Sequence, residues 1–282
     1  MLAYLSDRQW LWGAAGLYAA GVLLGAVALL RGRRASSAAV YGAILLGYVL
    51  QFVGLGLRGH ATGGCPLGNR FEIFQFTAWS AITLFLVVGV TFRSSIFGVL
   101  TSCLGSALTL VSLAIPSWDA IRRTHIFGGN PWIELHAALA MFSYGVFGLL
   151  ALASGMFLLR HYSLKSKNLG GWFTFLPSIL DLDHIEVRLL GTGVAILTAA
   201  LGFGYVYWSR DTSTVGHVKL AATVAVWIAY AAAFGLRLDG RLLARRFAWT
   251  CLALFAAALL SLEAVEGSRH PAAAPASERA TR

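Results

Sequence analysis

The sequence has few charged residues for its length. Asp, Glu, Lys and Arg make up only 12% of the 282 residues, whereas hydrophobic residues make up 58%. Soluble domains carry about 25% charged residues, so this composition is typical of a polytopic membrane protein and excludes an ordinary soluble one. Acidic residues are the scarcer sign, with 12 Asp and Glu against 22 Lys and Arg. No Arg-aromatic RNA motif accompanies the positive charge, so we assign it to loops at lipid headgroups and expect no nucleic-acid partner.

Cysteine is also scarce, and the three cysteines lie far apart. Cys65, Cys103 and Cys251 form no CxxC pair, which excludes the usual zinc and thioredoxin-like motifs. The CxxCH motif is missing as well, so this chain does not carry covalently attached c-type haem. The sequence contains no P-loop and no GxSxG element. We therefore name no catalytic residue and expect a handling or assembly factor rather than an enzyme.

What the sequence does contain is long apolar runs. About eight of them are long enough to cross a bilayer as helices, which predicts an all-α polytopic integral membrane protein with a single domain over residues 1–265. The first run is too long for the apolar part of a signal peptide, so we expect a retained anchor. No internal repeat is visible. The runs lie near residues 9–30, 37–57, 71–92, 96–115, 132–159, 187–208, 218–236 and 247–264.

Lys and Arg are unevenly divided between the two sets of loops. The richer set follows the first, third, fifth and seventh runs. Because positive loops stay in the cytoplasm, we expect a multi-pass protein of the bacterial inner membrane with both termini on the periplasmic side. The apolar segment 168–186, broken by Gly and Pro, would then be an interfacial cytoplasmic segment. The Ala/Pro/Ser-rich segment 266–282 is expected to be a disordered tail.

Two histidines are predicted at the same depth of the membrane. In "NPWIELHAALAM", Asn130 can cap a helix that begins at Pro131, and His136 then lies about 9 Å into it, near the outer interface. His217 precedes the seventh run on the same side. Neutral imidazole is an axial ligand for haem iron, so these two side chains could bind one haem from opposite faces. Alternatively, each histidine alone could be a headgroup-level or water-bonded side chain.

The flanking residues would suit a haem site. Trp132 and Trp208 could wall the porphyrin, although both could equally belong to the interfacial aromatic belt of a membrane protein. Haem propionates need cations, and four residues on this side could supply them: Arg122, Arg123, Arg210 and Lys219. Asn69 and Glu72 open the third run, where they could cap the helix or contribute to a site.

Three stretches together resemble the cytochrome c assembly protein family, which includes the CcsA, CcmC and HemX-like proteins. They are "PLGNRFEIFQFTAWS", "PWIELHAALAMFSYGVF" and "FLPSILDLDHIEVRLLGTGVAILTAALGFGYVYW", and the likeness extends from about residue 40 to residue 265. The resemblance implies non-covalent haem b held at the outer membrane face. His136 stands where the family has its first outer-face histidine, and the second ligand would be His217 or, alternatively, His270.

The chain departs from the family where tryptophans are expected. The family carries a WGxxWxWD-type segment between the sixth and seventh spans, whereas this chain reads "YVYWSRDTSTVGHVK" there, with Trp208 and Asp211 as remnants. A cytoplasmic-side histidine of the CcsA type would fall near Gly235, which cannot ligate a metal. The short chain and the His-x-Lys of His217 and Lys219 resemble the HemX-like branch most closely.

The resemblance implies a role in haem handling during cytochrome c biogenesis. The partners would be haem, membrane lipid, and either a second cytochrome c assembly membrane protein or apocytochrome c. The alternative is a HemX-like regulatory membrane protein that influences haem biosynthesis through a cytoplasmic partner without delivering haem. A small-molecule transporter is a third possibility.

Overall fold

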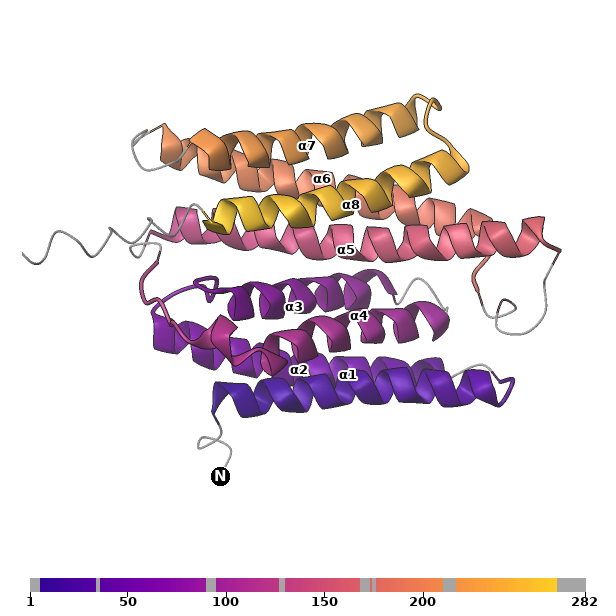
Figure 1. Ribbon diagram of the computed structural model, residues 1–282, viewed down its shortest axis with the longest axis horizontal. Helices are drawn as coiled ribbons and strands as arrows, with labels where there is room; N and C mark the ends of the chain where they lie inside the picture. Colours follow the sequence, from indigo (N-terminus) through magenta and orange to yellow (C-terminus); the bar gives the residue numbers. More distant parts are fainter. Residues whose placement is uncertain are drawn as a thin grey trace, which may run out of the picture.

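The computed structural model is all-helical, as the apolar runs predict (Figure 1). It describes residues 6–33, 36–89, 95–126, 130–167, 173, 176–209 and 217–267. Within these residues, eight α-helices and one short 3₁₀ helix, η2 (Pro116–Asp119), carry the fold. The α-helices are α1 (Asp7–Leu30), α2 (Ser37–Thr62), α3 (Arg70–Gly89), α4 (Ser95–Ala114), α5 (Pro131–Lys165), α6 (Ile179–Trp208), α7 (His217–Leu238) and α8 (Ala244–Gly267).

Six of the described helices are long and apolar enough to cross a membrane, namely α1, α2, α4, α5, α6 and α7. The other two pack against several neighbours. α3 contacts α2, α4 and α5, and its polar side chains Glu72 and Gln75 are buried. α8 packs against α5 and α7. The protein is therefore a multi-span membrane protein.

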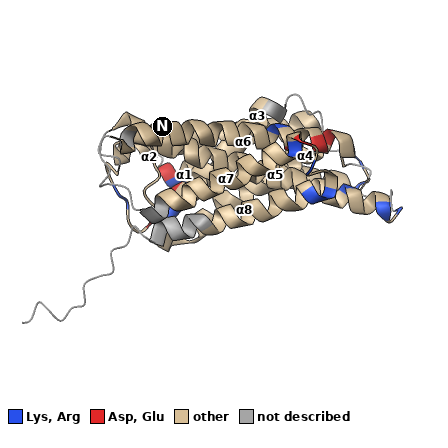
Figure 2. Cartoon of the chain, turned by 90° about the horizontal axis from the view of Figure 1, so that it is seen from above, with Lys and Arg blue, Asp and Glu red and all other residues tan. Residues whose placement is uncertain are grey.

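The helices form two layers that meet along α5. In Figure 1, α1–α4 make one layer and α5–α8 the other, and α5 packs on α3 from the first layer and on α6 and α8 from its own. Successive helices alternate in direction, so their ends gather at two poles of the bundle. We call the pole with the beginnings of α1, α3, α5 and α7 the His136 end, and the opposite pole the Arg237 end. Figure 2 shows the charged residues gathered towards these two poles.

Local sequence determines how α5 begins and how it meets α6. Asn130 Oδ1 accepts a hydrogen bond from the backbone N–H of Trp132 at 3.0 Å, and Pro131 occupies the first turn, which confirms the predicted cap. Further along α5, the ring of Phe147 lies against Gly193 of α6, where a Cβ would come within 2.4 Å of it. Tyr230 of α7 stacks on the same ring, with centroids 3.7 Å apart. The absence of a side chain at Gly193 thus permits close packing of α5, α6 and α7.

α6 begins earlier than the apolar run at 187–208 suggests. Ser178 Oγ accepts a hydrogen bond from the backbone N–H of Asp181 at 3.1 Å, and helix α6 starts at Ile179. Leu182 and Ile185 are buried in the main core. The second half of the segment 168–186 is therefore continuous with a membrane helix, and most of its first half lies outside the described residues.

Candidate functional site

His136 is held at the contact between α5 and α6. Its imidazole Nδ1 lies 2.6 Å from the carbonyl oxygen of Ala200, and the ring sits over Gly204, where a Cβ would approach Nδ1 to 2.7 Å. The side chain is half-buried. Gly204 is thus the residue that lets the imidazole reach the backbone of α6.

This hydrogen bond determines which ring nitrogen of His136 carries the proton. A carbonyl oxygen can only accept, so Nδ1 donates its N–H to Ala200, and Nε2 of the neutral ring keeps a lone pair. Metal-ligating histidines usually donate their other ring N–H to a carboxylate, a backbone carbonyl or water, which fixes the tautomer and the ring orientation. The hydrogen bond of His136 to Ala200 is therefore compatible with metal ligation by Nε2.

Aromatic side chains lie next to His136 along the same two helices. Trp132, one turn before His136 on α5, stacks on Phe203 of α6 with ring centroids 5.8 Å apart. Its side chain is 49% exposed. Near the end of α6, the ring centroids of Tyr205 and Trp208 lie 6.4 Å apart. These aromatic side chains thus lie at the same end of the bundle as His136, and their role as the wall of a haem site stays a prediction.

Several predicted site residues lie wholly or partly outside the described structure. α7 begins at His217, at the His136 end of the bundle, but the side chains of His217 and Lys219 are not among the described ones. Arg210, Asp211 and His270 lie outside the described residues. The pairing of His136 with His217 or His270 therefore stays a prediction.

The two predicted propionate partners that are described make other contacts. Arg122 pairs with the carboxylates of Asp7 at 3.3 Å and Asp119 at 3.7 Å, and its side chain is 44% exposed. Arg123 is half-buried, and its Cβ lies close to Gly68. The charge of Arg122 is thus shared with acidic groups of the first layer.

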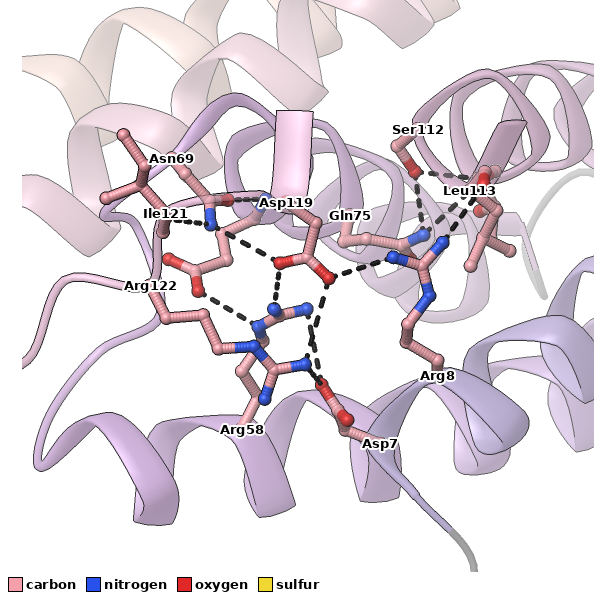
Figure 3. A network of polar contacts seen from close by, with 12 residues as sticks. Asp7, Arg8, Arg58, Asn69, Gln75, Ser112, Leu113, Asp119, Ile121 and Arg122 are labelled. Atoms are coloured by element: carbon pink, nitrogen blue, oxygen red, sulfur yellow. Dashed lines mark hydrogen bonds and ion pairs between the residues drawn. The ribbon is translucent and has the colours of Figure 1, made fainter. Parts of the chain in front are cut away.

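Those acidic groups surround Arg58, which lies in the last turns of α2 (Figure 3). The Arg58 side chain is 0% exposed, and its Nε lies 2.9 Å from Glu72 and its Nη1 3.2 Å from Asp7. Its Nη2 pairs with Asp119, which also accepts from Arg8 at 3.0 Å. We call Asp7, Arg8, Arg58, Glu72, Asp119 and Arg122 the Arg58 network. It joins the ends of α1, α2, α3 and η2.

Asn69 connects the Arg58 network to the start of α3. Its Oδ1 accepts from the backbone N–H of Glu72 at 2.9 Å, and its Nδ2 donates to the carbonyl of Ile121 at 3.1 Å. The predicted capping role of Asn69 is therefore confirmed, whereas Glu72 is a buried partner of Arg58. The sequence signal for this network was an Arg near the end of an apolar run, with acidic residues at the starts of two other helices.

A second chain of buried polar side chains lies in the same layer as the Arg58 network. Tyr18 donates to Gln51 Oε1 at 2.8 Å, and Gln51 Nε2 donates to Gln75 Oε1 at 2.9 Å. Gln75 Nε2 in turn donates to Ser112 Oγ at 2.8 Å. Because both amides are fully buried and bonded, they link α1, α2, α3 and α4 without leaving these polar groups unpaired.

Glu134, two residues before His136 on α5, faces a different part of the molecule from His136. Its carboxylate packs on Gly64 in the connection between α2 and α3, where a Cβ would lie 2.6 Å from Oε1. Cys65 follows in that connection. Burial, and then the negative charges of Glu134 and Glu72, raise the pKa of the Cys65 thiol from 9.0 to about 12. These effects disfavour the thiolate of Cys65, which is the reactive form of the side chain.

The chain is similar to known proteins over most of its length. The family model described as Cytochrome C assembly protein matches residues 67–265. Protein HemX of Bacillus subtilis (strain 168) is 25% identical over 231 residues, which cover 80% of this chain and 83% of that protein. Protein HemX of Brevibacillus brevis is 27% identical over 191 residues, 68% and 70% of the two chains. The cytochrome c biogenesis protein CcsA of Chlorella vulgaris is 25% identical over 240 residues, 71% and 73%.

Proposed function

The chain belongs to the cytochrome c assembly protein family, and from this premise we propose that it binds haem b non-covalently at the His136 end, with His136 as an axial ligand. Its role would be the handling of haem during cytochrome c biogenesis. The names of the CcsA relatives support a role in that process.

The observation that carries this proposal is the state of His136. The Nδ1–H of His136 donates to the carbonyl of Ala200. Nε2 of this half-buried side chain therefore has a lone pair with which it can bind a metal. Trp132 and Phe203, stacked next to it, supply apolar surface of the kind that a porphyrin contacts. The residues present therefore fit haem.

The second axial ligand would be His217, because α7 begins at that residue at the same end of the bundle. Arg210 and Lys219 would be the principal propionate partners, since Arg122 already shares its charge with Asp7 and Asp119. When bound, haem supplies the iron and the vinyl groups, and this chain supplies ligation and orientation. Transfer to apocytochrome c would depend on a partner, such as a second cytochrome c assembly membrane protein.

We propose that the His136 end faces the periplasm and the Arg237 end the cytoplasm of a bacterial inner membrane. The support is the distribution of positive charge. Loops and helix ends at the Arg237 end hold the larger share of Lys and Arg, including Arg160, Lys165 and Arg241. Positive loops remain on the cytoplasmic side.

The experiment is the absorption spectrum of the full chain purified in mild detergent from haem-replete cells. We expect a Soret band that is reduced in both His136→Ala and His217→Ala. His161→Ala, at the far end of α5, is the matched control and should leave the band unchanged. A colourless wild-type protein would contradict haem binding and favour the regulatory alternative, which capture of a cytoplasmic enzyme through residues 160–186 would then test.

A further inference from the structure

Glu186 is a buried carboxyl group with no described partner. It lies in α6, seven residues after the first residue of the helix, and its side chain is 0% exposed. Neither Oε1 nor Oε2 has a hydrogen-bond partner among the residues that the structure describes. Ionisable groups inside membrane helices are rare, and they mark functional positions when they face protein. Glu186 is therefore unlike the charged residues of the Arg58 network, which are all paired.

The position of Glu186 follows from the packing of α5 on α6. These helices are antiparallel, and Phe147 of α5 lies on Gly193 of α6. Ser154 lies seven residues after Phe147 on α5, and Glu186 lies seven residues before Gly193 on α6. Because seven residues are about two helical turns, Ser154 and Glu186 face each other across the same contact between the two helices. The Ser154 hydroxyl lies beside the carboxyl group, although the two groups do not meet the geometry of a hydrogen bond. His136 and Glu186 therefore occupy opposite ends of one seam.

The groups facing Glu186 from the other helices are polar but mostly uncharged. α8 contributes Cys251, which lies near both Glu186 and Ser154. α7 contributes Arg237 and Tyr230. Tyr230 is a neighbour of Cys251, and the Tyr230 hydroxyl has no described hydrogen-bond partner. No described ion pair joins Arg237 to Glu186.

The charge of Arg237 is directed elsewhere. It pairs with Asp183 of α6, and its guanidinium donates to the carbonyl of Leu242 and lies 4.9 Å from the ring centre of Phe247. Exposure falls stepwise from the side chain of Asp183 (25%) to Arg237 (10%) and Glu186 (0%). The Asp183–Arg237 pair therefore forms a polar connection from the Arg237 end towards the buried carboxyl.

A buried carboxylate without hydrogen bonds or a counter-ion is strongly disfavoured, so Glu186 must bind a cation or a proton. Among the described residues, no group of three or more His, Cys, Asp or Glu side chains converges as a metal site would require. We propose that Glu186 is an intramembrane proton-binding site that exchanges its proton with the Arg237 end by way of the Asp183 carboxylate, which takes a proton from water and passes it on, while Arg237 keeps its own protons. The step is the addition of one proton to the carboxylate, giving a neutral carboxylic acid.

The proton-binding carboxyl of Glu186 lies far from the His136 end. From Gly204, under His136, to Glu186 there are eighteen residues of α6, or about 27 Å. The stacked rings of Phe147 and Tyr230 lie between them and bring no titratable group at neutral pH. Proton exchange at Glu186 is therefore independent of haem binding at His136, and the proposal stands apart from the proposed function.

Infrared difference spectroscopy of the full chain in lipid tests the proposal. At neutral pH, we expect the carbonyl stretch of a protonated carboxylic acid, shifted in D₂O, and lost in Glu186→Gln. Glu134→Gln, which removes a carboxyl group at the opposite pole, should retain it. A band that survives Glu186→Gln, or no such band in the wild type, would overturn the proposal.

Two further variants keep the test decisive if Glu186→Gln does not fold. Ser154→Ala should shift the band because the hydroxyl lies beside the carboxyl group, whereas Ser106→Ala, a buried serine of α4, should not. Asp183→Asn should slow hydrogen–deuterium exchange of the band. An exchange rate unchanged in Asp183→Asn would contradict the proposed route.

Discussion

The Nδ1 atom of His136 on α5 lies 2.6 Å from the carbonyl oxygen of Ala200 on α6. This hydrogen bond joins the first helix of the second layer to its neighbour, and it leaves Nε2 without a proton, so that its lone pair can bind a metal. The contact is possible because Gly204, one turn further along α6, has no side chain.

Substitution of Gly204 tests whether the orientation of His136 matters for haem binding. A methyl group at this position would lie 2.7 Å from Nδ1, so Gly204→Ala must displace the ring. Loss of such an orienting contact typically lowers metal affinity by about 10- to 100-fold, and we expect a comparable loss in haem titration. Gly202→Ala is the control, because a Cβ there meets nothing within 4 Å. Equal haem affinity in both variants would argue against a role of the α5–α6 contact in orienting His136.

Arg58 should be the most sensitive charged residue for stability. Arg58→Met removes the cation that faces Asp7, Glu72 and Asp119 while keeping apolar volume. Removing one partner of a buried ion pair costs about 3–5 kcal/mol, and we expect the free energy of unfolding in detergent to fall by that order. Arg241→Met, at an exposed position, should change it little. The account of the network fails if the two variants unfold alike.

Cys65 should show an unusual pH dependence. Its pKa is raised to about 12, so the folded chain keeps the thiol proton between pH 9 and pH 12, where the unfolded chain loses it. The stability linked to this proton is thus present below pH 9 and is lost as the pH rises towards 12. Labelling by a water-soluble maleimide at pH 8 should be much slower for Cys65 than for a free thiol.

A charge-removing variant provides the control for Cys65. Glu134→Gln takes away a negative charge that raises the thiol pKa, so labelling should become faster. The Cys65→Ala protein identifies the signal from this residue. Rapid labelling of the wild type at pH 8 would show that the thiol is neither buried nor next to acidic groups.

Local sequence was enough to predict the helix start at Pro131 and the place of His136 along α5, because a cap and a helical rise depend only on neighbouring residues. The Arg58 network could not be predicted in the same way. Arg58 and Asp119 are 61 residues apart and meet only when α2 and η2 pack. Charged residues near the ends of apolar runs look solvated in sequence, and only tertiary packing reveals that Arg58 is buried.

The segment before α6 gives the same lesson. Glycine and proline at 170, 171 and 177 suggested a separate interfacial segment, but Ser178 caps a helix that continues to Trp208. The start of α6 therefore lies eight residues before the start of the apolar run, and Glu186 becomes part of the helix core. Hydropathy predicted the span but not the residue at which α6 begins, because the first turns of α6 are buried by other parts of the protein.

The most direct test of haem ligation by His136 is the absorption spectrum of His136→Gly with and without added imidazole. A ligand role predicts a reduced Soret band in the variant and its recovery when imidazole occupies the vacated position. A variant that keeps the full wild-type Soret band without imidazole would contradict ligation by His136, and so would a band that imidazole fails to restore in a folded protein.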